Sequence, residues 1–561
     1  MKLSSKWFVA DFETTGIKYY KENGYTKVWL WAVCDDKSNI VKYGNDINSF
    51  IERVKLNSGA TIYFHNLKFD GSFILNYLFE NNYTRKEKIT IKDKNSFSTL
   101  IGEMGEFYKI RVVFTSGKNI TFVDSLKIIP LKVKEIAKAF NLPIQKEIID
   151  YDNYVINDET LSYIYNDVKI VAMALKFFKD KGFNKLTIGS NSYNTFINSI
   201  KNSNELFPIL DDDFLIDYRK AYRGGRCQVN PKYANKVLTN VRRYDLNSMY
   251  PYIMAYKYLP YGKPIKCDIP NTYKFELYKV SIMFTLKKGH LPSLLKKGSL
   301  YDIIGDTYYE NSDGIELLYI SSIDLEILKR HYDIKYLKYE EIYGFHTADF
   351  IFRDFILKYY ELKNNSTGGL KLVYKLILNS LYGKFGSKLY SKHKIPYIDE
   401  ERLKYKSSEL ERMKEYYLPL AIAVVSYAHL IIDDAISYNI DKFVYCDTDS
   451  VHTLDTLPSY MVNNREIGKF KLEGMESKSK YVRQKCYVYC QDEKYNITCS
   501  GMTESIKDYL GNKYKDEIFN IFKEGLIVNE DSEDITINDL KLRPKQVKGG
   551  CVLVPTPFSI K

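Results

Sequence analysis

Two aspartates one residue apart stand in the motif YCDTDS at 445–450, between apolar or β-branched runs at 442–444 and 451–454. Such runs around a polar centre indicate a tight β-hairpin. Residues at i and i+2 of an extended segment share a face, so Asp447 and Asp449 would offer carboxylates to one small volume. Close carboxylates repel unless they share a proton or a cation. Two divalent ions about 3.5–4 Å apart would use such a pair in phosphoryl transfer, whereas turn chemistry alone would also explain the hexapeptide.

Two more alternating acids occur near the start of the chain. In the segment WFVADFETTG at 7–16, Asp11 and Glu13 alternate with apolar residues, which places both carboxylates on one face of a strand. A second predicted strand, TIYF at 61–64, leads to Asp70 and then to a helical pattern. Each of these acids, taken alone, would also fit a surface carboxylate or a helix cap.

A third acidic motif lies in a predicted helix. Tyr163 and Asp167 are four residues apart, so they point the same way from that helix. In this order, the three motifs resemble the exonuclease motifs of the DnaQ-like 3′–5′ proofreading nucleases. The resemblance implies that Tyr163 orients the attacking water, that Lys146 supports catalysis, and that four carboxylates hold two Mg²⁺ or Mn²⁺ ions. Those carboxylates are Asp11, Glu13, Asp70 and Asp167.

Several residues between these motifs are suited to holding a frayed single strand. Phe69 could stack on a base, Asn66 could hydrogen-bond to a sugar or phosphate, and Ser125 could contact a phosphate. For Phe69, a place in the hydrophobic core is an equal alternative. The resemblance adds His65 and Leu126 to this DNA-binding set.

A third acid could join Asp447 and Asp449. In the motif DLNSMYP at 245–251, Asp245 ends a predicted strand, and the chain then turns sharply before Pro251. A third carboxylate beside the pair would complete a two-metal site.

A basic stripe follows on a predicted helix. Lys371, Lys375 and Asn379 recur at i, i+4 and i+8, so they lie along one face, with Tyr382 close to its end. Basic stripes are usually solvated helix faces. Lysines nevertheless suit a triphosphate, and a ring at the end of the stripe suits a base.

In chain order, DLNSMYP, then KLILNSLYG at 375–383, then YCDTDS resemble motifs A, B and C of the family B DNA polymerases. The resemblance implies that Asp245 and Asp449 are the main metal ligands, with Asp447 in support. The other roles implied are a metal ligand at Leu246, triphosphate contacts from Lys363, Lys371 and Lys375, a nucleotide contact from Asn379, a steric gate against ribonucleotides at Tyr250, and packing of Tyr382 under the nascent base pair.

Within that family the chain is most similar to the protein-primed subgroup of phi29-like phage DNA polymerases. The likeness rests on the strings YFHNLKFDG, LPYG and LNSLYGKF, on the turn YRGG, and on KCY at 485–487. Paired glycines let backbone N–H groups approach phosphate, although most such pairs are only turns. The implied DNA contacts are Tyr222, Arg223, Gly224, Gly225, Lys485 and Tyr487. One departure leaves a further template or primer contact open: where the subgroup usually has Thr-x-x-x-Arg before motif C, this chain has Val425 and His429.

The predicted fold is α/β and multidomain. The resemblance implies an N-terminal RNase H-like (DnaQ-like) 3′–5′ exonuclease domain, followed by a palm, fingers and thumb polymerase domain with two insertions. The expected segments are the exonuclease domain 1–186, the first part of the palm 187–256, a first insertion 257–350 for docking the priming protein, the fingers 351–386, a second insertion 387–416 for strand displacement and processivity, the second part of the palm 417–515, and the thumb 516–561.

Composition agrees with a polyanionic partner. The 561 residues carry a formal net charge of +12 and 51 tyrosines, a combination of cations and rings that suits a nucleic-acid groove. The eight cysteines form no CxxC pair, which favours reduced thiols and argues against zinc. The longest apolar run, 418–432, is shorter than the about 20 residues that span a bilayer, so we expect a buried helix there and no membrane partner.

We therefore expect a DNA-directed DNA polymerase with a 3′–5′ proofreading exonuclease, using Mg²⁺ or Mn²⁺, two ions at each site. Its expected partners are double- and single-stranded DNA, dNTPs and a terminal protein primer, and it would act as a monomer in the cytoplasm of a bacterial host. An RNA-synthesising palm polymerase is disfavoured by the nuclease motifs and by Tyr250. A catalytically silent DNA-binding initiation factor is the other alternative, and the complete set of carboxylates weighs against it.

Overall fold

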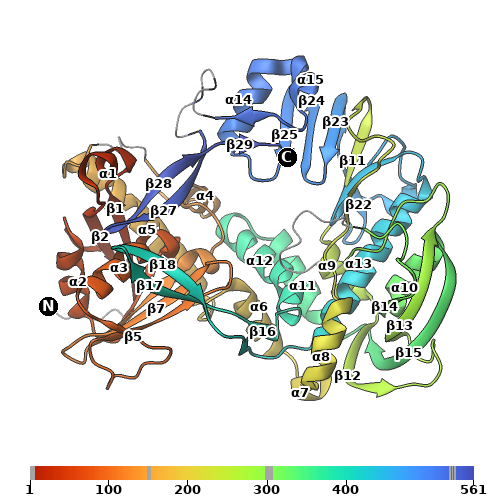
Figure 1. Ribbon diagram of the computed structural model, residues 1–561, viewed down its shortest axis with the longest axis horizontal. Coiled ribbons are helices and arrows are strands. Elements are labelled where there is room, and N and C mark those ends of the chain that lie inside the picture. The colour runs from red at the N-terminus through yellow and green to blue at the C-terminus, as the bar shows by residue number, and fades with distance from the viewer. Residues whose placement is uncertain are drawn as a thin grey trace.

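The structure is a computed structural model that describes residues 7–147, 153–296, 308–529, 532, 535 and 539–560. The N-terminal elements lie on one side of the molecule and the elements around motifs A and C on the other, with helices α11 (Arg353–Asn364) and α12 (Gly368–Phe385) between them (Figure 1). The C-terminal hairpin reaches back to the N-terminal side (Figure 1). The last segment of the chain therefore lies beside the N-terminal domain.

The N-terminal domain is built on an eight-stranded sheet of order β3-β2-β1-β4-β8-β7-β6-β5. Its centre is β1 (Trp7–Thr14), which pairs in parallel with β4 (Thr61–Phe64) and antiparallel with β2 (Val28–Asp35). Every residue of β2 is buried, because helices cover both faces of the sheet. The predicted strand at 61–64 is thus confirmed as β4.

Two helices sandwich this sheet. Val9 belongs to the core formed with α5 (Asp158–Asp180), whereas Phe8 belongs to the core formed with α3 (Leu67–Glu80). Successive residues of a strand face opposite sides, so Asp11 and Glu13 share the α5 side with Val9. The start of α5 is fixed by Asn157, whose side chain accepts a hydrogen bond from the backbone N–H of Thr160.

A five-stranded sheet of order β22-β11-β21-β20-β9 lies in the two segments expected to form the palm. The predicted hairpin is present: β20 (Phe443–Asp447) and β21 (Ser450–Thr453) pair antiparallel across a two-residue loop. On its other side, β21 pairs with β11 (Val241–Leu246), which brings Asp245 opposite Ser450. The register therefore places motif A directly beside motif C.

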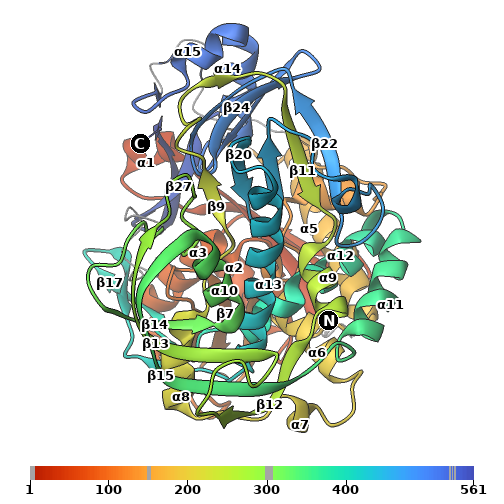
Figure 2. The same cartoon turned by 90° about the vertical axis from the view of Figure 1, so that its right-hand side faces the viewer.

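The apolar run before motif C forms α13 (Leu418–Tyr438), a core helix of the palm, as predicted. Among the described residues it is the one helix long and apolar enough to cross a membrane, but most of its apolar length is buried inside the protein. In Figure 2, α13 runs alongside α10 (Ser322–His331) of the first insertion. The sheet β12-β15-β13-β14 of that insertion, within 259–348, lies beside them.

The segment 387–416, which the sequence predicts to be the second insertion, folds as short hairpins. Its longest strands, β17 (Lys394–Asp399) and β18 (Arg402–Ser407), pair antiparallel. The C-terminal hairpin of β27 (Lys541–Val547) and β28 (Gly550–Thr556) packs nearby, and Lys548 at its tip forms an ion pair of 2.6 Å with Glu401 between β17 and β18. Two segments far apart in the chain thus meet at their tips.

The C-terminal hairpin also contacts the N-terminal domain. The backbone N–H of Thr26 donates to the carbonyl of Lys548 at 3.0 Å. Gly549 has φ +83° at this contact, and a Cβ there would lie 2.2 Å from the Thr26 carbonyl oxygen, so only glycine fits. The hydrophobic core of the C-terminal lobe extends from Val482 to Ile560, so the expected boundary at 516 falls inside one packed unit.

Candidate active sites

The four acids of the nuclease motifs line one cavity of about 280 Å³. Asp11 and Glu13 come from β1, Asp70 from α3 and Asp167 from α5, so three elements must pack correctly to bring them together. The cavity is also lined by His65, Asn66, Phe69, Lys146, Tyr163 and Leu553.

The charges of these carboxylates are poorly compensated by the protein. Burial, reinforced by the charge of Asp167 and opposed by Lys146, raises the pKa of Asp11 to about 7. Burial and the neighbouring carboxylates also raise the pKa values of Glu13 and Asp70 well above the usual range. One buried carboxylate oxygen each of Asp70 and Asp167 has no hydrogen-bond partner. Such a donor set fits divalent cations, which would supply the missing positive charge.

Lys146 and Tyr163 stand together at the edge of this acidic set. The ammonium group of Lys146 pairs with the Asp167 carboxylate and lies 4.7 Å from the centre of the Tyr163 ring. Lys146 thus holds one of the four carboxylates, and Tyr163 lines the same cavity as predicted from its spacing to Asp167.

The segment around Ser125 is more deeply buried than its sequence suggested. The Ser125 hydroxyl lies 3.0 Å from the Phe64 carbonyl and 3.0 Å from Nδ1 of His65, whose Nε2 lies 2.7 Å from the Leu131 carbonyl. Ser125 has no exposed surface. Its hydroxyl therefore helps to hold the His65 ring in place and is not open to solvent.

Asp124 organises the neighbouring backbone, and the sequence analysis did not single it out. Its Oδ1 accepts hydrogen bonds of 3.0 Å from the backbone N–H groups of both Asn66 and Leu126. Asn66 has a left-handed backbone with φ +78°, which the carboxylate helps to hold. The signal that could have found Asp124 is its position at the end of a strand, ahead of a polar turn.

Leu553 lines the nuclease cavity, and the sequence did not reveal it. It comes from β28 of the C-terminal hairpin, nearly 400 residues after Asp167. No local pattern around 553 points to a nuclease cavity, because the contact depends on the return of the chain.

Asp245 of motif A and Asp449 of motif C line a separate cavity of about 500 Å³. The backbone N–H of Leu246 donates to the carbonyl of Asp449 at 2.8 Å, which fixes Asp245 and Asp449 side by side. Burial, reinforced by Asp449, raises the pKa of Asp245 to about 6, and burial also raises the pKa of Asp449. Two close, partly buried carboxylates with raised pKa values fit divalent cations here as well.

Asp447 does not line this cavity, although its carboxylate is close enough to contribute to the raised pKa of Asp449. Thr448 has a left-handed backbone with φ +61°, and the two aspartates flank a turn instead of lying along one extended strand. Asp447 faces Lys485, whose Nζ lies 2.8 and 2.6 Å from its two carboxylate oxygens. Asp447 thus meets Lys485 of KCY, a residue for which the sequence implied only a DNA contact.

Cations and rings from the helices face the carboxylates of this cavity. Lys375, Asn379 and Tyr382 reach it from α12 and Lys363 from α11, while Lys371 of the predicted stripe is exposed outside it. The rings of Tyr250 and Tyr382 are stacked with centres 4.0 Å apart. Nζ of Lys363 lies 3.4 Å from the Ser248 hydroxyl. The stacked rings and the lysines thus stand opposite Asp245 and Asp449.

The YRGG turn lies between this cavity and the first insertion. Arg223 points inward, donating to the carbonyls of Leu295 at 3.1 Å and Tyr319 at 3.2 Å. A Cβ on Gly225 would lie 3.0 Å from the Thr448 hydroxyl. The turn therefore packs against the loop that joins β20 to β21, called the catalytic loop below because Asp449 lies in it. Tyr487 of KCY is stacked on Tyr481, with ring centres 5.1 Å apart.

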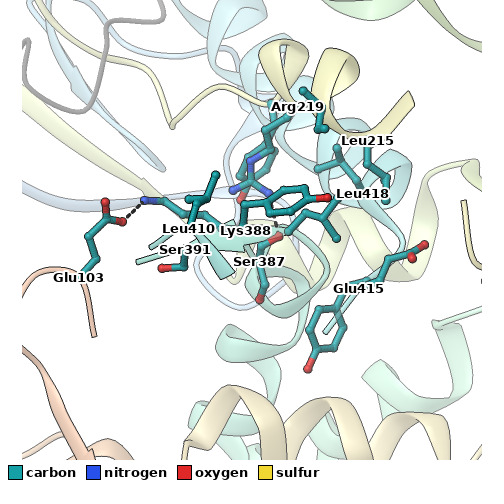
Figure 3. A pocket seen from close by; sticks show the side chains of 14 residues that line it. Glu103, Leu215, Arg219, Ser387, Lys388, Ser391, Leu410, Glu415 and Leu418 are labelled. Carbon is teal, nitrogen blue, oxygen red and sulfur yellow. Dashed lines mark hydrogen bonds and ion pairs between the residues drawn. The ribbon is translucent and has the colours of Figure 1, made fainter. Parts of the chain in front are cut away.

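A third cavity, of about 570 Å³, lies at the base of the second insertion (Figure 3). Glu103 of the N-terminal domain and Lys388 of the second insertion meet across it through an ion pair of 2.9 Å. Tyr222 and Arg219 line it from the start of the palm, and Arg219 donates to the Ser387 carbonyl at 2.9 Å. Three parts of the molecule therefore enclose one space next to the YRGG turn.

The comparisons with known proteins decide the family. The model of the family "DNA polymerase type B, organellar and viral" matches residues 51–155 and 151–466. The chain belongs to the type B DNA polymerases. It is 33% identical to the DNA polymerase of Bacillus phage M2 over all of both chains, and 31% identical to that of Streptococcus phage Cp-1 over 99% of this chain and 98% of that one. The solved phi29 DNA polymerase superposes with a TM-score of 0.89 at 32% identity, over 99% of this chain and 100% of that chain.

As a phi29-like type B polymerase, the chain is a nucleotidyltransferase that combines exonuclease and polymerase domains. Polymerases of this family require divalent metal ions, and both carboxylate sites fit them. Among the described residues, no three acidic, histidine or cysteine side chains are gathered closely enough to hold an ion by themselves.

Proposed function

We propose that this polymerase replicates a linear phage or plasmid genome, starts on a protein primer, displaces the strand ahead, and proofreads with its N-terminal domain. The observation that carries this proposal is the presence of two separate carboxylate cavities, one facing Lys146 and Tyr163 and one facing lysines and stacked tyrosines. A primer-extension gel with Mg²⁺ and dNTPs, with and without a mismatched 3′ end, tests both activities. Retention of the primer without extension or shortening would favour the silent initiation factor instead.

In the nuclease site, Asp11, Glu13, Asp70 and Asp167 would hold two Mg²⁺ or Mn²⁺ ions. When bound, these ions activate a water and neutralise the leaving 3′-oxygen. Tyr163 would orient that water, and Lys146 holds the Asp167 carboxylate through their ion pair. Phe69, Asn66 and His65 line the cavity and would receive the single-stranded 3′ end. Ser125 and Leu126 would support them from behind, through the hydrogen bonds to His65 and Asp124.

In the polymerase site, Asp245, Asp449 and the Leu246 backbone would hold two ions, which polarise the reacting phosphate and the primer hydroxyl when bound. Lys363 and Lys375 would neutralise the triphosphate and the developing pyrophosphate, with Lys371 contributing at a distance. Asn379 and Tyr382 would contact the base pair, and Tyr250 would close the space beneath C2′ of the sugar. Asp447 would act indirectly, through Lys485, near the primer end.

DNA would run between the two domains. Tyr222, Gly224 and Gly225 stand next to the catalytic loop, where they would meet the template. The buried side chain of Arg223 supports the turn from behind. Lys485 and Tyr487 would lie along the primer strand. We assign docking of the terminal protein to the first insertion and propose that the enzyme acts as a monomer in the cytoplasm of its host.

The second insertion would open the duplex. The cavity at its base joins Glu103, Lys388 and Tyr222, which supports a passage that leads the template toward the YRGG turn (Figure 3). Contact between the tips at Lys548 and Glu401 supports a closed path around the DNA. A displaced strand cannot follow the template through a narrow passage, so synthesis itself would separate the strands.

Deleting 390–413 tests this assignment. We expect shorter products on long templates and stalling at a downstream duplex, with the defect growing at higher salt because phosphate contacts weaken. Filling of short gaps and degradation of single-stranded 3′ ends are the internal controls, since neither needs strand separation. A deletion variant that still displaces thousands of paired bases would refute the assignment.

A further inference from the structure

His429, one of the two positions at which this chain departs from the subgroup pattern, lies in a buried polar network between α13 and α10. Nδ1 of His429 lies 2.8 Å from Oδ1 of Asp324 in α10, and Nε2 lies 2.7 Å from the carbonyl oxygen of Gly224. His429 is 8% exposed and Asp324 is 7% exposed. One imidazole ring thus joins three segments: α13, α10 and the YRGG turn.

Both partners of the ring are acceptors. A carbonyl oxygen only accepts, and an ionised carboxylate only accepts, whereas a neutral imidazole has one donor and one acceptor. Asp324 already accepts from the hydroxyls of Ser426 at 2.6 Å and Ser321 at 2.9 Å, as an ionised carboxylate does. His429 therefore satisfies both neighbours only when it donates from both nitrogens, as imidazolium.

The charges around the pair agree with this state. Burial tends to raise the pKa of Asp324, but His429, Arg223 and Ser426 outweigh it and lower that pKa below its usual value. Arg223 from the turn and Asp324 from α10 are the charged groups that face the ring. One helical turn further along α13, Asp433 is paired with Arg226 at 2.7 Å and with His331 at 2.9 Å.

The network ends at the catalytic loop. Gly224 is followed by Gly225, which packs against Thr448, and by Arg226, whose carbonyl accepts from the Thr448 backbone N–H at 2.7 Å. Thr448 precedes Asp449. A displacement of the YRGG turn would therefore be passed directly to a carboxylate of the polymerase site.

We propose that His429, held as imidazolium by Asp324, is a positioning residue of the polymerase site that fixes the catalytic loop through the Gly224 carbonyl. The inference rests on the polymerase function. It makes helix α10 of the first insertion a structural support of that site. It also gives a role to His429, one of the two positions that differ from the subgroup's Thr-x-x-x-Arg pattern.

The first test compares His429→Gln with Tyr427→Phe, a control on the same helix that loses a hydroxyl bonded to the Tyr258 carbonyl outside the network. Glutamine can donate to one neighbour but presents its oxygen to the other. We expect the rate of nucleotide insertion at saturating dNTP to fall about tenfold or more, since an ångström of misplacement costs up to about 100-fold. The KM for dNTP and the exonuclease rate should stay within about twofold, because the lysines that would bind the triphosphate and the nuclease carboxylates lie outside this network.

The second test uses Asp324→Asn. It distinguishes a role of His429 in positioning the catalytic loop from a general contribution to the stability of the fold. An asparagine can donate to Nδ1, so a neutral ring then makes both hydrogen bonds. The double donation of wild type needs a proton on both ring nitrogens, and alkaline pH removes one of them. The ratio of insertion rates, Asp324→Asn over wild type, should therefore be higher at alkaline than at neutral pH.

Three results would overturn the proposal. They are a ratio that does not change with pH, an unchanged insertion rate in His429→Gln, or parallel loss of insertion, exonuclease activity and Tm in that variant. A wild-type protein that fails to extend primers at all would instead refute the polymerase function itself, which keeps the two failures distinct.

Discussion

The nuclease and polymerase cavities both gather carboxylates, but they differ in the positive charge that the protein supplies. Among the residues that line the nuclease cavity, Lys146 is the cation facing four carboxylates. Lys363 and Lys375 face two carboxylates in the polymerase cavity, and Lys485 pairs with the nearby Asp447. The difference follows the substrates: a triphosphate brings its own negative charge to the polymerase site, whereas a single phosphodiester brings little.

Burial increases the contrast. Asp11 sits deep between a sheet and its covering helices, and its pKa of about 7 exceeds the value of about 6 for Asp245. A carboxylate that is hard to ionise binds a metal only after it loses its proton. The nuclease site therefore depends more strongly on its ions, and the polymerase site more strongly on its own lysines.

The largest effect should come from removing carboxylates at one site. Asp11→Ala with Asp70→Ala should reduce degradation of single-stranded 3′ ends at least about 100-fold, since even outer partners of metal ligands contribute 10–100-fold. Primer extension should stay within about twofold, because distant sites act independently. Asp449→Ala should do the reverse. Loss of extension in the first variant comparable to that in the second would break the division into two sites.

An intermediate effect should come from the sugar gate, which exists at one site only. Tyr250→Val should raise the ratio of ribonucleotide to deoxynucleotide insertion about 10–100-fold, the range that a change of one pocket contact gives. Excision of a ribonucleotide and of a deoxynucleotide 3′ end should keep their wild-type ratio. An unchanged insertion ratio in single-nucleotide kinetics would mean that the stacked pair Tyr250–Tyr382 is not the gate.

The smallest effect should be the pH dependence of metal demand. Between pH 8 and pH 6, the half-saturating Mn²⁺ concentration should rise roughly tenfold for the exonuclease and about twofold for extension, because protons compete for Asp11 near pH 7 and for Asp245 near pH 6. The sign is fixed, since protonation removes a ligand and falling pH must weaken binding. Equal shifts at both sites would contradict the burial argument.

Local patterns predicted most of the elements that carry chemistry. Alternation located β1 and β4, a polar centre between apolar runs located the β20–β21 hairpin, and the i, i+4 spacing located Lys375 and Asn379 on α12. These predictions succeed because the repeat of side-chain directions along a strand or a helix shows within a few residues. The spacing of Asp447 and Asp449 did not reveal that Thr448 between them is left-handed, or that Asp447 pairs with Lys485.

Sequence by itself determined which residues are chemically competent: the acids, lysines and rings, their order, and the family they indicate. Only the tertiary structure decided which of them meet. Leu553 reaches the nuclease cavity, Lys485 holds Asp447, and His429 joins Asp324 to Gly224, each across a long stretch of chain. Such contacts leave no local periodicity, because they arise when separate packed units close on one another and must satisfy every buried donor and acceptor at once.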